Sequence, residues 1–361
     1  MSLLFSLNFH NKNYNKTLKV LFIISLIFYG KHVVKLIAPL FDTPLVSIII
    51  PVHNNFRYTY HLLISILNKN TNIPYEIIIA DDMSKDETKI IEQYTKNIIV
   101  LHNEKKYNFL LNCNKASKYA KGKYILFLNN DSKVNYGWLD SLVNLIESDD
   151  KIGMVGSKLI FPNGKLQEAG GIVFNDGECA NYGRYDNSDK PEYNYVKEVD
   201  YISGASILIR KSIWEKIGGF DERFTPAYYE DTDLAFQLRK NGYKVIYQPQ
   251  SILIHFEGIS NGKKLNSGIK KFQEINKFKF IKKWKDELKC LESINNTFIG
   301  RDRSYNKSRI LIVDRWVPNY DKDAGARFCF LYINLFKEIG LQVTFIGHDF
   351  SKKVFIFRDQ I

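Results

Sequence analysis

The chain has 361 residues, 45% of them hydrophobic, so it can bury a substantial core in one large domain with additions or in two domains. Lys and Arg number 51 against 39 Asp and Glu, a formal net charge of +12. This excess favours a nucleic acid, an anionic membrane or a phosphorylated substrate, unless it reflects biased base composition of the genome. The composition excludes a disordered chain. The four scattered cysteines form no Cys-x-x-Cys motif and fit a reducing compartment.

An apolar run, LKVLFIISLIFY, occupies residues 18–29. It is shorter than the roughly 20 apolar residues that a membrane-spanning helix needs, and no small-x-small cleavage site follows it, as a signal peptide would require. We therefore expect a helix that lies at a membrane interface or docks on protein, with a true span as the alternative. Residues 1–43 are interpreted as an apolar and basic segment, with membrane association as one role.

Predicted strands and helices alternate in the first half of the sheet-forming region. A helix is expected at residues 57–68, and Ser84 is expected to cap another helix with Glu87 completing a capping box. The predicted strands are residues 46–51 (VSIIIP), 76–80 (EIIIA), 97–101 and 123–128 (KYILFL). This alternation predicts a parallel α/β sheet, in which ligands bind beyond the carboxyl ends of the strands.

Shorter elements and more glycine follow in the second half. Residues 200–210 read as a strand with a glycine break, and residues 231–241 as a helix closed by Gly242. A short strand at residues 244–247 is predicted to stop before Pro249, with another strand at residues 251–255.

Two polar clusters directly follow predicted strands. Asp81-Asp82 can accept hydrogen bonds from a ribose hydroxyl or a base N–H, or they can simply begin a loop. Asn129-Asn130-Asp131 can hold a divalent cation that bridges a diphosphate, or it can be ordinary turn chemistry.

Two further clusters carry titratable groups. Glu230, Asp231 and Asp233 place three carboxylates at the start of a predicted helix, where mutual repulsion raises at least one pKa. This pattern fits a general base, or only a match to the helix dipole. His255 lies between an apolar strand and a glycine-containing turn, where a ligand role is plausible beside an ordinary structural one.

These segments together resemble the family 2 glycosyltransferases, especially the branch with bacterial rhamnosyltransferases and other surface-polysaccharide enzymes. The resemblance covers residues 45–262. It implies the GT-A fold, a Rossmann-like central mixed sheet flanked by helices, for a domain at residues 44–262. The matching segments, in the order and spacing of the family, are VSIIIPVHN, EIIIADDMSKDET, GKYILFLNNDS, DYISGASILIRKSIWEKIGGFDERF, YYEDTDLAFQLRKNGYKV and IHFEGIS.

The resemblance also implies roles for the polar clusters. Asp82 stands where the family reads the base or ribose of the nucleotide, with Asp81 beside it. Asn129 stands at the first acid of the family's D-x-D metal motif, which leaves Asp131 as the main anionic ligand of Mg²⁺ or Mn²⁺, with His255 as an additional metal or diphosphate contact.

Asp231 matches the general base of the family, with Glu230 and Asp233 in support. His53 departs from the family, which commonly has Tyr at this place. The nucleotide-sugar contacts that the resemblance implies, in addition to Asp81 and Asp82, are Pro51, His53, Asn54, Asn129, Asn130 and Gly204.

The remainder of the chain is predicted to form two further segments. Residues 263–307 contain a Lys-rich helix and a polar linker, and the helix either packs on the main domain through its aromatic side chains or lies on an anionic membrane. Residues 308–361 contain a strand, helix and strand, one βαβ unit. That unit resembles the start of a GT-B glycosyltransferase domain, too incomplete to bind a donor and therefore expected to be inactive.

The sequence is thus interpreted as a metal-dependent, inverting glycosyltransferase that acts in cell-surface polysaccharide biosynthesis, including O-antigen. The donor is expected to be a UDP- or dTDP-sugar, with dTDP-rhamnose among the options, and the acceptor a glycan or lipid-linked glycan. A cytoplasmic location at the inner face of the plasma membrane is expected. The alternative is a non-catalytic, GT-A-like partner that binds nucleotide sugar or glycan, and no nucleic-acid-binding motif is present.

Overall fold

The structure is a computed structural model. It describes residues 35–69, 71–258, 271–293, 296–303, 308–316, 318, 320–321, 323–347 and 357–358. The apolar run at residues 18–29 lies outside these ranges, so its membrane association stays a prediction. Within the described ranges, none of the helices combines the length and the apolar character needed to cross a bilayer.

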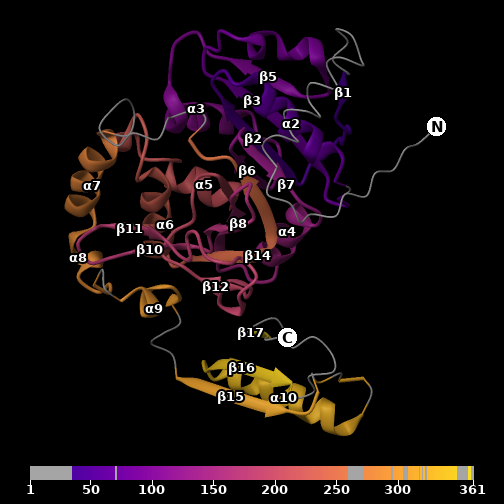
Figure 1. Cartoon of the computed structure of the whole chain (residues 1–361), viewed down its shortest axis with the longest axis vertical. Helices are drawn as coiled ribbons and strands as arrows, with labels where there is room; N and C mark the ends of the chain where they lie inside the picture. Colours follow the sequence, from indigo (N-terminus) through magenta and orange to yellow (C-terminus); the bar gives the residue numbers. More distant parts are fainter. Residues whose placement is uncertain are drawn as a thin grey trace.

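A mixed sheet forms the centre of the larger unit (Figure 1). Its strands lie in the order β12-β14-β8-β13-β6-β2-β3-β5, with β7 paired to β14 and β9 to β8. The strands are β2 (Val46–Val52), β3 (Tyr75–Asp81), β5 (Ile99–His102), β6 (Tyr124–Leu128), β7 (Ser132–Val134), β8 (Ile152–Ile160), β9 (Leu166–Glu168), β12 (Lys197–Glu198), β13 (Ser206–Arg210) and β14 (Lys244–His255).

The predicted parallel arrangement is confirmed for the first half of this sheet. Strands β2, β3, β5 and β6 pair in parallel. Strand β13 then runs antiparallel between β6 and β8, which makes the sheet mixed as the resemblance implied. Because β13 runs antiparallel to β6, the loop that precedes β13 lies next to the carboxyl end of β6.

Helices cover both faces of the sheet, and the alternation of apolar side chains along the strands explains the two cores. In β2, Ile48 and Ile50 face one core while Ile49 faces the other. Helices α2 (Phe56–Leu67) and α4 (Trp138–Glu147) pack on the first face. Helices α3 (Asn108–Ala116), α5 (Lys211–Ile217) and α6 (Glu230–Lys240) pack on the second.

Three local expectations were wrong. Strand β14 continues through Pro249, because a register shift against β8 between Gln248 and Ile252 removes the need for a ladder N–H there. Ser84 caps no helix; Asp86 caps the 3₁₀ stretch η1 (Glu87–Tyr94) by accepting from the Thr88 N–H. Only residues 206–210 of the expected strand at 200–210 pair in the sheet.

The remaining short elements surround this sheet. They are β1 (Leu36–Ile37), β4 (Thr95–Lys96), β10 (Gly171–Val173), β11 (Cys179–Asn181), η2 (Ser117–Tyr119), η3 (Pro191–Tyr193), η4 (Glu222–Phe224) and α9 (Thr297–Gly300). Strand β1 pairs with β4, and β10 with β11.

The Lys-rich segment packs on the larger unit through α7 (Lys271–Lys283) and α8 (Lys285–Leu288). Phe280 and Trp284 are buried against Phe236 of α6, with ring centroids 4.9 and 5.4 Å from it. This agrees with an aromatic stripe that docks the helix on the main domain. Phe278 does not belong to that stripe, because it is 70% exposed.

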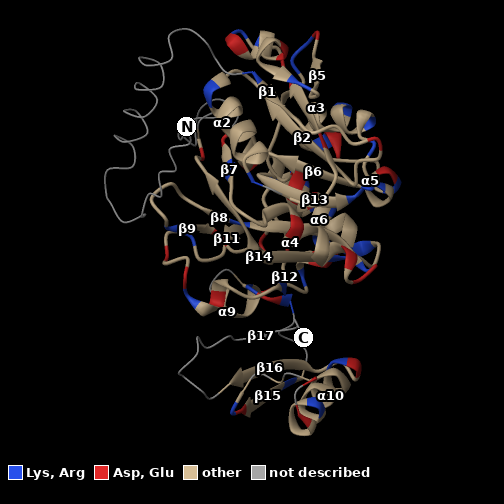
Figure 2. Cartoon of the chain, turned by 90° about the vertical axis from the view of Figure 1, so that its right-hand side faces the viewer, with Lys and Arg blue, Asp and Glu red and all other residues tan. Residues whose placement is uncertain are grey.

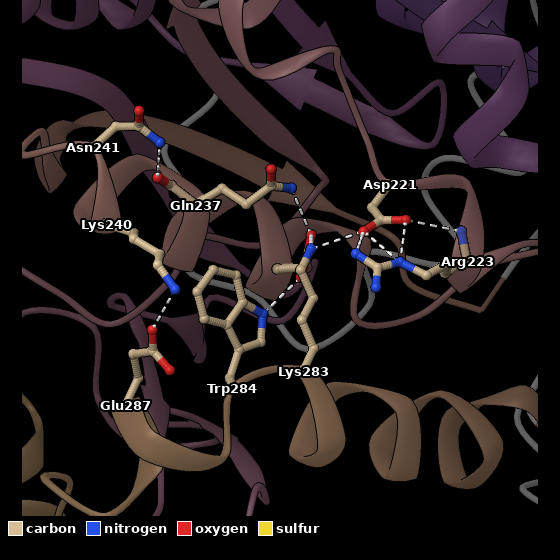
Figure 3. A network of polar contacts seen from close by, with 9 residues as sticks. Asp221, Arg223, Gln237, Lys240, Asn241, Lys283, Trp284 and Glu287 are labelled. Carbon is tan, nitrogen blue, oxygen red and sulfur yellow. Dashed lines mark hydrogen bonds and ion pairs between the residues drawn. The ribbon is translucent and has the colours of Figure 1, made fainter.

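A polar network secures this docking (Figure 3). The buried carboxylate of Asp233 accepts from Trp284 Nε1 at 2.7 Å and from Lys283 Nζ at 2.8 Å. Lys283 Nζ also contacts Asp221 Oδ2 at 2.7 Å, and Gln237 Nε2 donates to Asp233 at 2.7 Å. Since the buried charge is paired and fully hydrogen-bonded, it fixes α7 and α8 at one position along α6.

The described residues near the C-terminus form a second, smaller unit. Strands β15 (Arg309–Asp314) and β16 (Gln342–Gly347) pair in parallel, joined by α10 (Ala324–Glu338), and β17 (Phe357–Arg358) pairs with β16. A small core of Ile333, Val343 and Phe345 holds them together. Figures 1 and 2 show this unit at one end of the molecule, with acidic and basic residues interspersed over both units.

Removing the Trp284 side chain should destabilise the larger unit strongly. Trp284→Ala leaves a cavity and a buried Asp233 oxygen without its donor, so the free energy of unfolding should fall by about 3–5 kcal/mol. Phe278→Ala, which removes an exposed aromatic side chain of α7, should change it by no more than about 0.5 kcal/mol. Urea denaturation followed by fluorescence of the remaining tryptophans measures both, and equal effects would contradict the packing described.

Candidate active site

Asp81 and Asp82 lie at the carboxyl end of β3, and both are buried. The Asp82 carboxylate accepts from the backbone N–H groups of Tyr107 and Asn108, at 2.7 and 2.8 Å, and from Asn103 Nδ2 at 3.3 Å. Asp82 thus holds the loop that leads into α3, which the sequence alone did not indicate.

Asp81 is engaged in a similar way. It accepts from the Ser84 N–H at 3.0 Å and from His102 Nδ1 at 2.8 Å, while Glu92 lies 2.6 Å from the other ring nitrogen of His102. Burial lowers the pKa of His102, but hydrogen bonds to the two carboxylates outweigh burial and raise it overall.

The loop after β2 turns sharply below this edge. Asn54 and Asn55 adopt left-handed backbone conformations, with φ of 57° and 63°, which Asn tolerates better than most residues. Asn54 Oδ1 accepts from the Lys85 N–H at 2.7 Å. His53 Nδ1 lies 2.8 Å from the Asp82 carbonyl oxygen, so Nδ1 carries the proton and Nε2 accepts, 3.3 Å from Lys106 Nζ.

The predicted Asn-Asn-Asp cluster follows β6 directly. The Asn129 N–H donates to the Ala205 carbonyl at 3.0 Å, and Asn130 Nδ2 donates to Thr59 Oγ1 at 3.0 Å. The structure brings Asp131 and His255 together as expected, with Asp131 Oδ1 3.2 Å from His255 Nε2. Strand β7 pairs with the end of β14, and this pairing places the two residues side by side.

The surroundings of this pair fit a divalent cation. His255 Nδ1 lies 3.2 Å from Gln167 Oε1, so with the amide oxygen accepting, Nδ1 carries the ring proton. Nε2 and the Asp131 carboxylate then face each other as two acceptors, an arrangement that a cation or a second ring proton would satisfy. Within the described part of the chain, no group of three or more His, Cys, Asp or Glu gathers for a metal, so further ligands would come from elsewhere.

Asp231 lies half-buried in the first turn of α6. Its carboxylate accepts from the Gly204 N–H at 2.9 Å and from the Thr232 N–H at 2.7 Å. Burial nevertheless raises the pKa of Asp231. Burial also raises the pKa of Glu230, with a further contribution from the negative charge of Asp231. A carboxyl with a raised pKa beside fixed donors has the properties of a general base.

Asp233 differs from its two neighbours. It lies two residues beyond Asp231 on α6, so its side chain points to another side of the helix and anchors Lys283 and Trp284, as described above. The contacts of Asp233 therefore support the position of the helix, and none of them reaches Asp231.

Glu168 is a site residue that sequence reasoning missed. Its Oε1 accepts from the Ser203 N–H at 3.1 Å, so the adjacent amides of residues 203 and 204 hold Glu168 and Asp231. Glu168 is 1% exposed. Burial raises its pKa to about 8, with the negative charges of Asp231 and Glu257 adding to burial and the Ser203 N–H opposing it. A lone Glu in a three-residue strand carries no signal by which its burial could have been foreseen.

Comparisons with known proteins identify the α/β domain that carries these residues. Residues 47–217 match the model of glycosyl transferase family 2. The structure resembles that of GalNAc-T7 with UDP, GalNAc and Mn²⁺, with a TM-score of 0.55 and 16% identity over 69% of this chain and 49% of that one. This chain carries a glycosyl transferase family 2 domain, and that domain has the GT-A fold.

Several curated proteins are similar in sequence. The O-antigen biosynthesis protein RfbC of Myxococcus xanthus is 31% identical over 62% of this chain, and this chain spans 18% of RfbC. The O-antigen chain rhamnosyltransferase WbaN of Salmonella anatum is 27% identical over 59% of this chain and 66% of WbaN. An uncharacterized glycosyltransferase of Rickettsia prowazekii, RP339, is 29% identical over 72% of this chain and 78% of that protein.

The burial of Glu168 predicts a stability that depends on pH. Its folded pKa of about 8 lies above the ordinary value of 4.5, so between these values the unfolded chain releases a proton that the folded chain keeps. Stability is therefore lost as pH rises through this window. Glu168→Gln removes the effect, so its gain in unfolding free energy over the wild type should grow from pH 5 to pH 8, to at most about 5 kcal/mol. Urea denaturation at pH 5, 6.5 and 8 measures it, and a difference independent of pH would contradict the assignment.

Proposed function

We propose that this chain is an inverting glycosyltransferase that transfers a sugar from a nucleotide diphosphate donor to a hydroxyl of a glycan acceptor. The observation that carries the proposal is Asp231, a carboxyl with a raised pKa held by the Gly204 and Thr232 amides. Similarity to RfbC and WbaN supports a role in surface-polysaccharide synthesis. The intact base makes a non-catalytic binding partner the weaker alternative.

In the proposed reaction, Asp231 accepts the proton of the acceptor hydroxyl as its oxygen attacks the anomeric carbon. One displacement forms the new glycosidic bond and breaks the bond to the diphosphate, which leaves with its electron pair and inverts the anomeric configuration. The amides of Gly204 and Thr232 hold the Asp231 carboxylate in a fixed orientation for this proton transfer. Burial keeps the proton affinity of Asp231 high, and Glu230 beside it is proposed to support the base.

Asp131 and His255 would hold a divalent cation, Mg²⁺ or Mn²⁺, whose chemistry is to neutralise the charge that develops on the leaving diphosphate. Gln167 orients the His255 ring for this purpose. We propose this cation because Nε2 of His255 and Oδ1 of Asp131 face each other as two acceptors.

The donor is proposed to bind along the carboxyl ends of β2, β3 and β6. Asp82 and Asp81 secure the loops of this edge, and the neighbouring His53 ring is proposed to contact the nucleoside. The donor is proposed to be a UDP- or dTDP-sugar, dTDP-rhamnose among the options, and similarity to the rhamnosyltransferase WbaN supports rhamnose as the sugar. The residues proposed to line the donor site are Pro51, His53, Asn54, Asp81, Asp82, Asn129, Asn130 and Gly204.

The larger unit at residues 44–262 is proposed to carry the activity, with α7 and α8 as its structural support. The βαβ unit within residues 308–361 is proposed to be catalytically inactive. A peripheral position at the cytoplasmic face of the plasma membrane is proposed from the basic surplus and the apolar run at residues 18–29.

Asp231→Asn should abolish transfer while donor binding stays nearly intact. The base acts on the acceptor proton, so kcat should fall by about 10²- to 10⁴-fold with little change in donor affinity. Release of nucleoside diphosphate from UDP-, dTDP- and GDP-sugars, with donor titration on the same protein, measures both quantities. Asp150→Asn, a fully exposed carboxyl between α4 and β8, is the matched control. Turnover of Asp231→Asn near that of the control would exclude Asp231 as the base.

Activity should require Mg²⁺ or Mn²⁺. Asp131→Ala removes one of the two facing acceptors, so it should weaken binding of a nucleoside diphosphate by about tenfold or more while the nucleoside alone binds as before. Calorimetric titration with UDP and uridine, or with dTDP and thymidine, provides the comparison, and Asp150→Ala is the control. Full activity in excess EDTA would refute the metal assignment.

A further inference from the structure

A stacked aromatic pair, half-buried Phe161 and exposed Tyr185, lies on the segments that flank β9. Phe161 follows β8, and Tyr185 lies in the turn after β11. Their rings stack with centroids 5.1 Å apart and planes inclined by 5°. The Arg184 guanidinium lies 5.1 Å from the Phe161 ring and 4.8 Å from the Tyr185 ring. We call Phe161, Arg184 and Tyr185 the aromatic platform.

The platform is held rigidly on the β8–β9 hairpin. The Phe161 N–H donates to the Lys165 carbonyl at 2.8 Å and closes the hairpin turn. The Tyr185 N–H donates to the Leu166 carbonyl of β9 at 2.8 Å. Tyr185 nevertheless has a left-handed backbone, with φ of 69°, and its side chain is 58% exposed. A bulky residue held at positive φ with its ring in solvent is the kind of local strain that recurs at binding sites.

Strand β9 connects the platform to the candidate active site. The two residues that follow Leu166 are Gln167, which contacts His255, and Glu168, which shares the loop of residues 203–204 with Asp231. Arg184 Nη2 donates to Glu257 Oε2 at 2.7 Å, two residues beyond His255. The buried Glu168 feels the charges of Asp231, Arg184 and Glu257. These contacts link the platform, through β9 and Glu257, to the elements that carry His255 and to the 203–204 loop that holds Asp231.

The charges of this region select a neutral ligand. Arg184 is already paired with Glu257, so its positive charge is offset and offers an added anion little attraction. A sugar ring matches the remaining chemistry. Its C–H face packs on an aromatic ring, and its hydroxyls can exchange hydrogen bonds with the Tyr185 hydroxyl and the guanidinium.

From this arrangement we propose that Phe161, Arg184 and Tyr185 form the subsite that binds a neutral sugar ring of the acceptor glycan. The inference rests on the proposed function, because it takes Asp231 as the base toward which the acceptor hydroxyl points. The platform holds the ring by stacking, while Asp231 meets the hydroxyl that attacks the donor. The subsite thereby restricts acceptors to chains that end in an uncharged sugar.

Binding is tested without catalysis by saturation-transfer NMR on the full chain, with methyl glycosides of rhamnose, galactose and N-acetylglucosamine as probes. Tyr185→Ala removes the platform, Tyr185→Phe keeps its stacking face, and Tyr119→Ala is the matched control. Tyr119 is a half-exposed tyrosine that precedes β6, at the opposite end of that strand from the site. Thermal denaturation of each variant verifies that it is folded.

The wild type, Tyr185→Phe and Tyr119→Ala should show saturation transfer to at least one glycoside, and Tyr185→Ala should lose it. In transfer assays with octyl glycosides, Tyr185→Ala should raise the acceptor KM roughly fivefold to tenfold, with the rate of donor hydrolysis unchanged. Lack of binding of every glycoside to the wild type, or equal binding by Tyr185→Ala, would overturn the subsite.

The two proposals can fail separately. A wild-type protein that binds glycosides through Tyr185 but neither hydrolyses nor transfers from any UDP-, dTDP- or GDP-sugar would overturn the proposed function. A wild-type protein that transfers sugar with an acceptor KM indifferent to Tyr185→Ala would leave that function standing and overturn the subsite alone.

Discussion

The amides of Ser203 and Gly204 hold the two carboxyl groups around which the candidate site is organised. One binds Glu168 at 3.1 Å and the next binds Asp231 at 2.9 Å. This arrangement depends on β13, which runs antiparallel between β6 and β8 and brings the 203–204 loop to the carboxyl end of β6. A purely parallel sheet would carry that loop to the other edge, away from Asp131 and His255.

Gathering carboxyl groups in this way lowers the stability of the fold, and hydrogen bonds and ion pairs to individual carboxylates offset this loss. Backbone N–H groups stabilise the Asp231 carboxylate, while burial still raises its pKa. Asp233 is stabilised separately by Lys283 and Trp284 from α7 and α8 (Figure 3). The Lys-rich helix therefore has a structural part in the site, since it fixes the helix on which the base lies.

Much of the fold could be predicted because its signals are local. The strand at residues 46–52 is continuous and β-branched, and the polar clusters after it, at 81–82 and 129–131, stand where parallel strands must end. The pairing of Asp131 with His255 was likewise foreseen, although their roles stay predictions. Pro249 led to a wrongly predicted strand end. A bulge in the pairing with β8 means that no N–H is needed at Pro249, and this bulge depends on β8 and not on the residues around Pro249.

What the sequence could not indicate are contacts made by tertiary structure alone. Asp82 was expected to face a nucleotide, yet its oxygens hold the 107–108 amides, and Glu168 gave no local sign that it would be buried beside the base. Asp233 was predicted only as a supporting residue of Asp231, and its contacts with Lys283 and Trp284 come from tertiary packing.

The central claim is that Asp231 drives a single displacement at the anomeric carbon. It is tested most directly by proton NMR of the product formed from a donor of known anomeric configuration, with the wild-type chain, an octyl glycoside acceptor and Mn²⁺. The account predicts a product in which the configuration is inverted from its first appearance. A product that retains the donor's configuration would require two displacements or a front-side path, and would contradict the role given to Asp231.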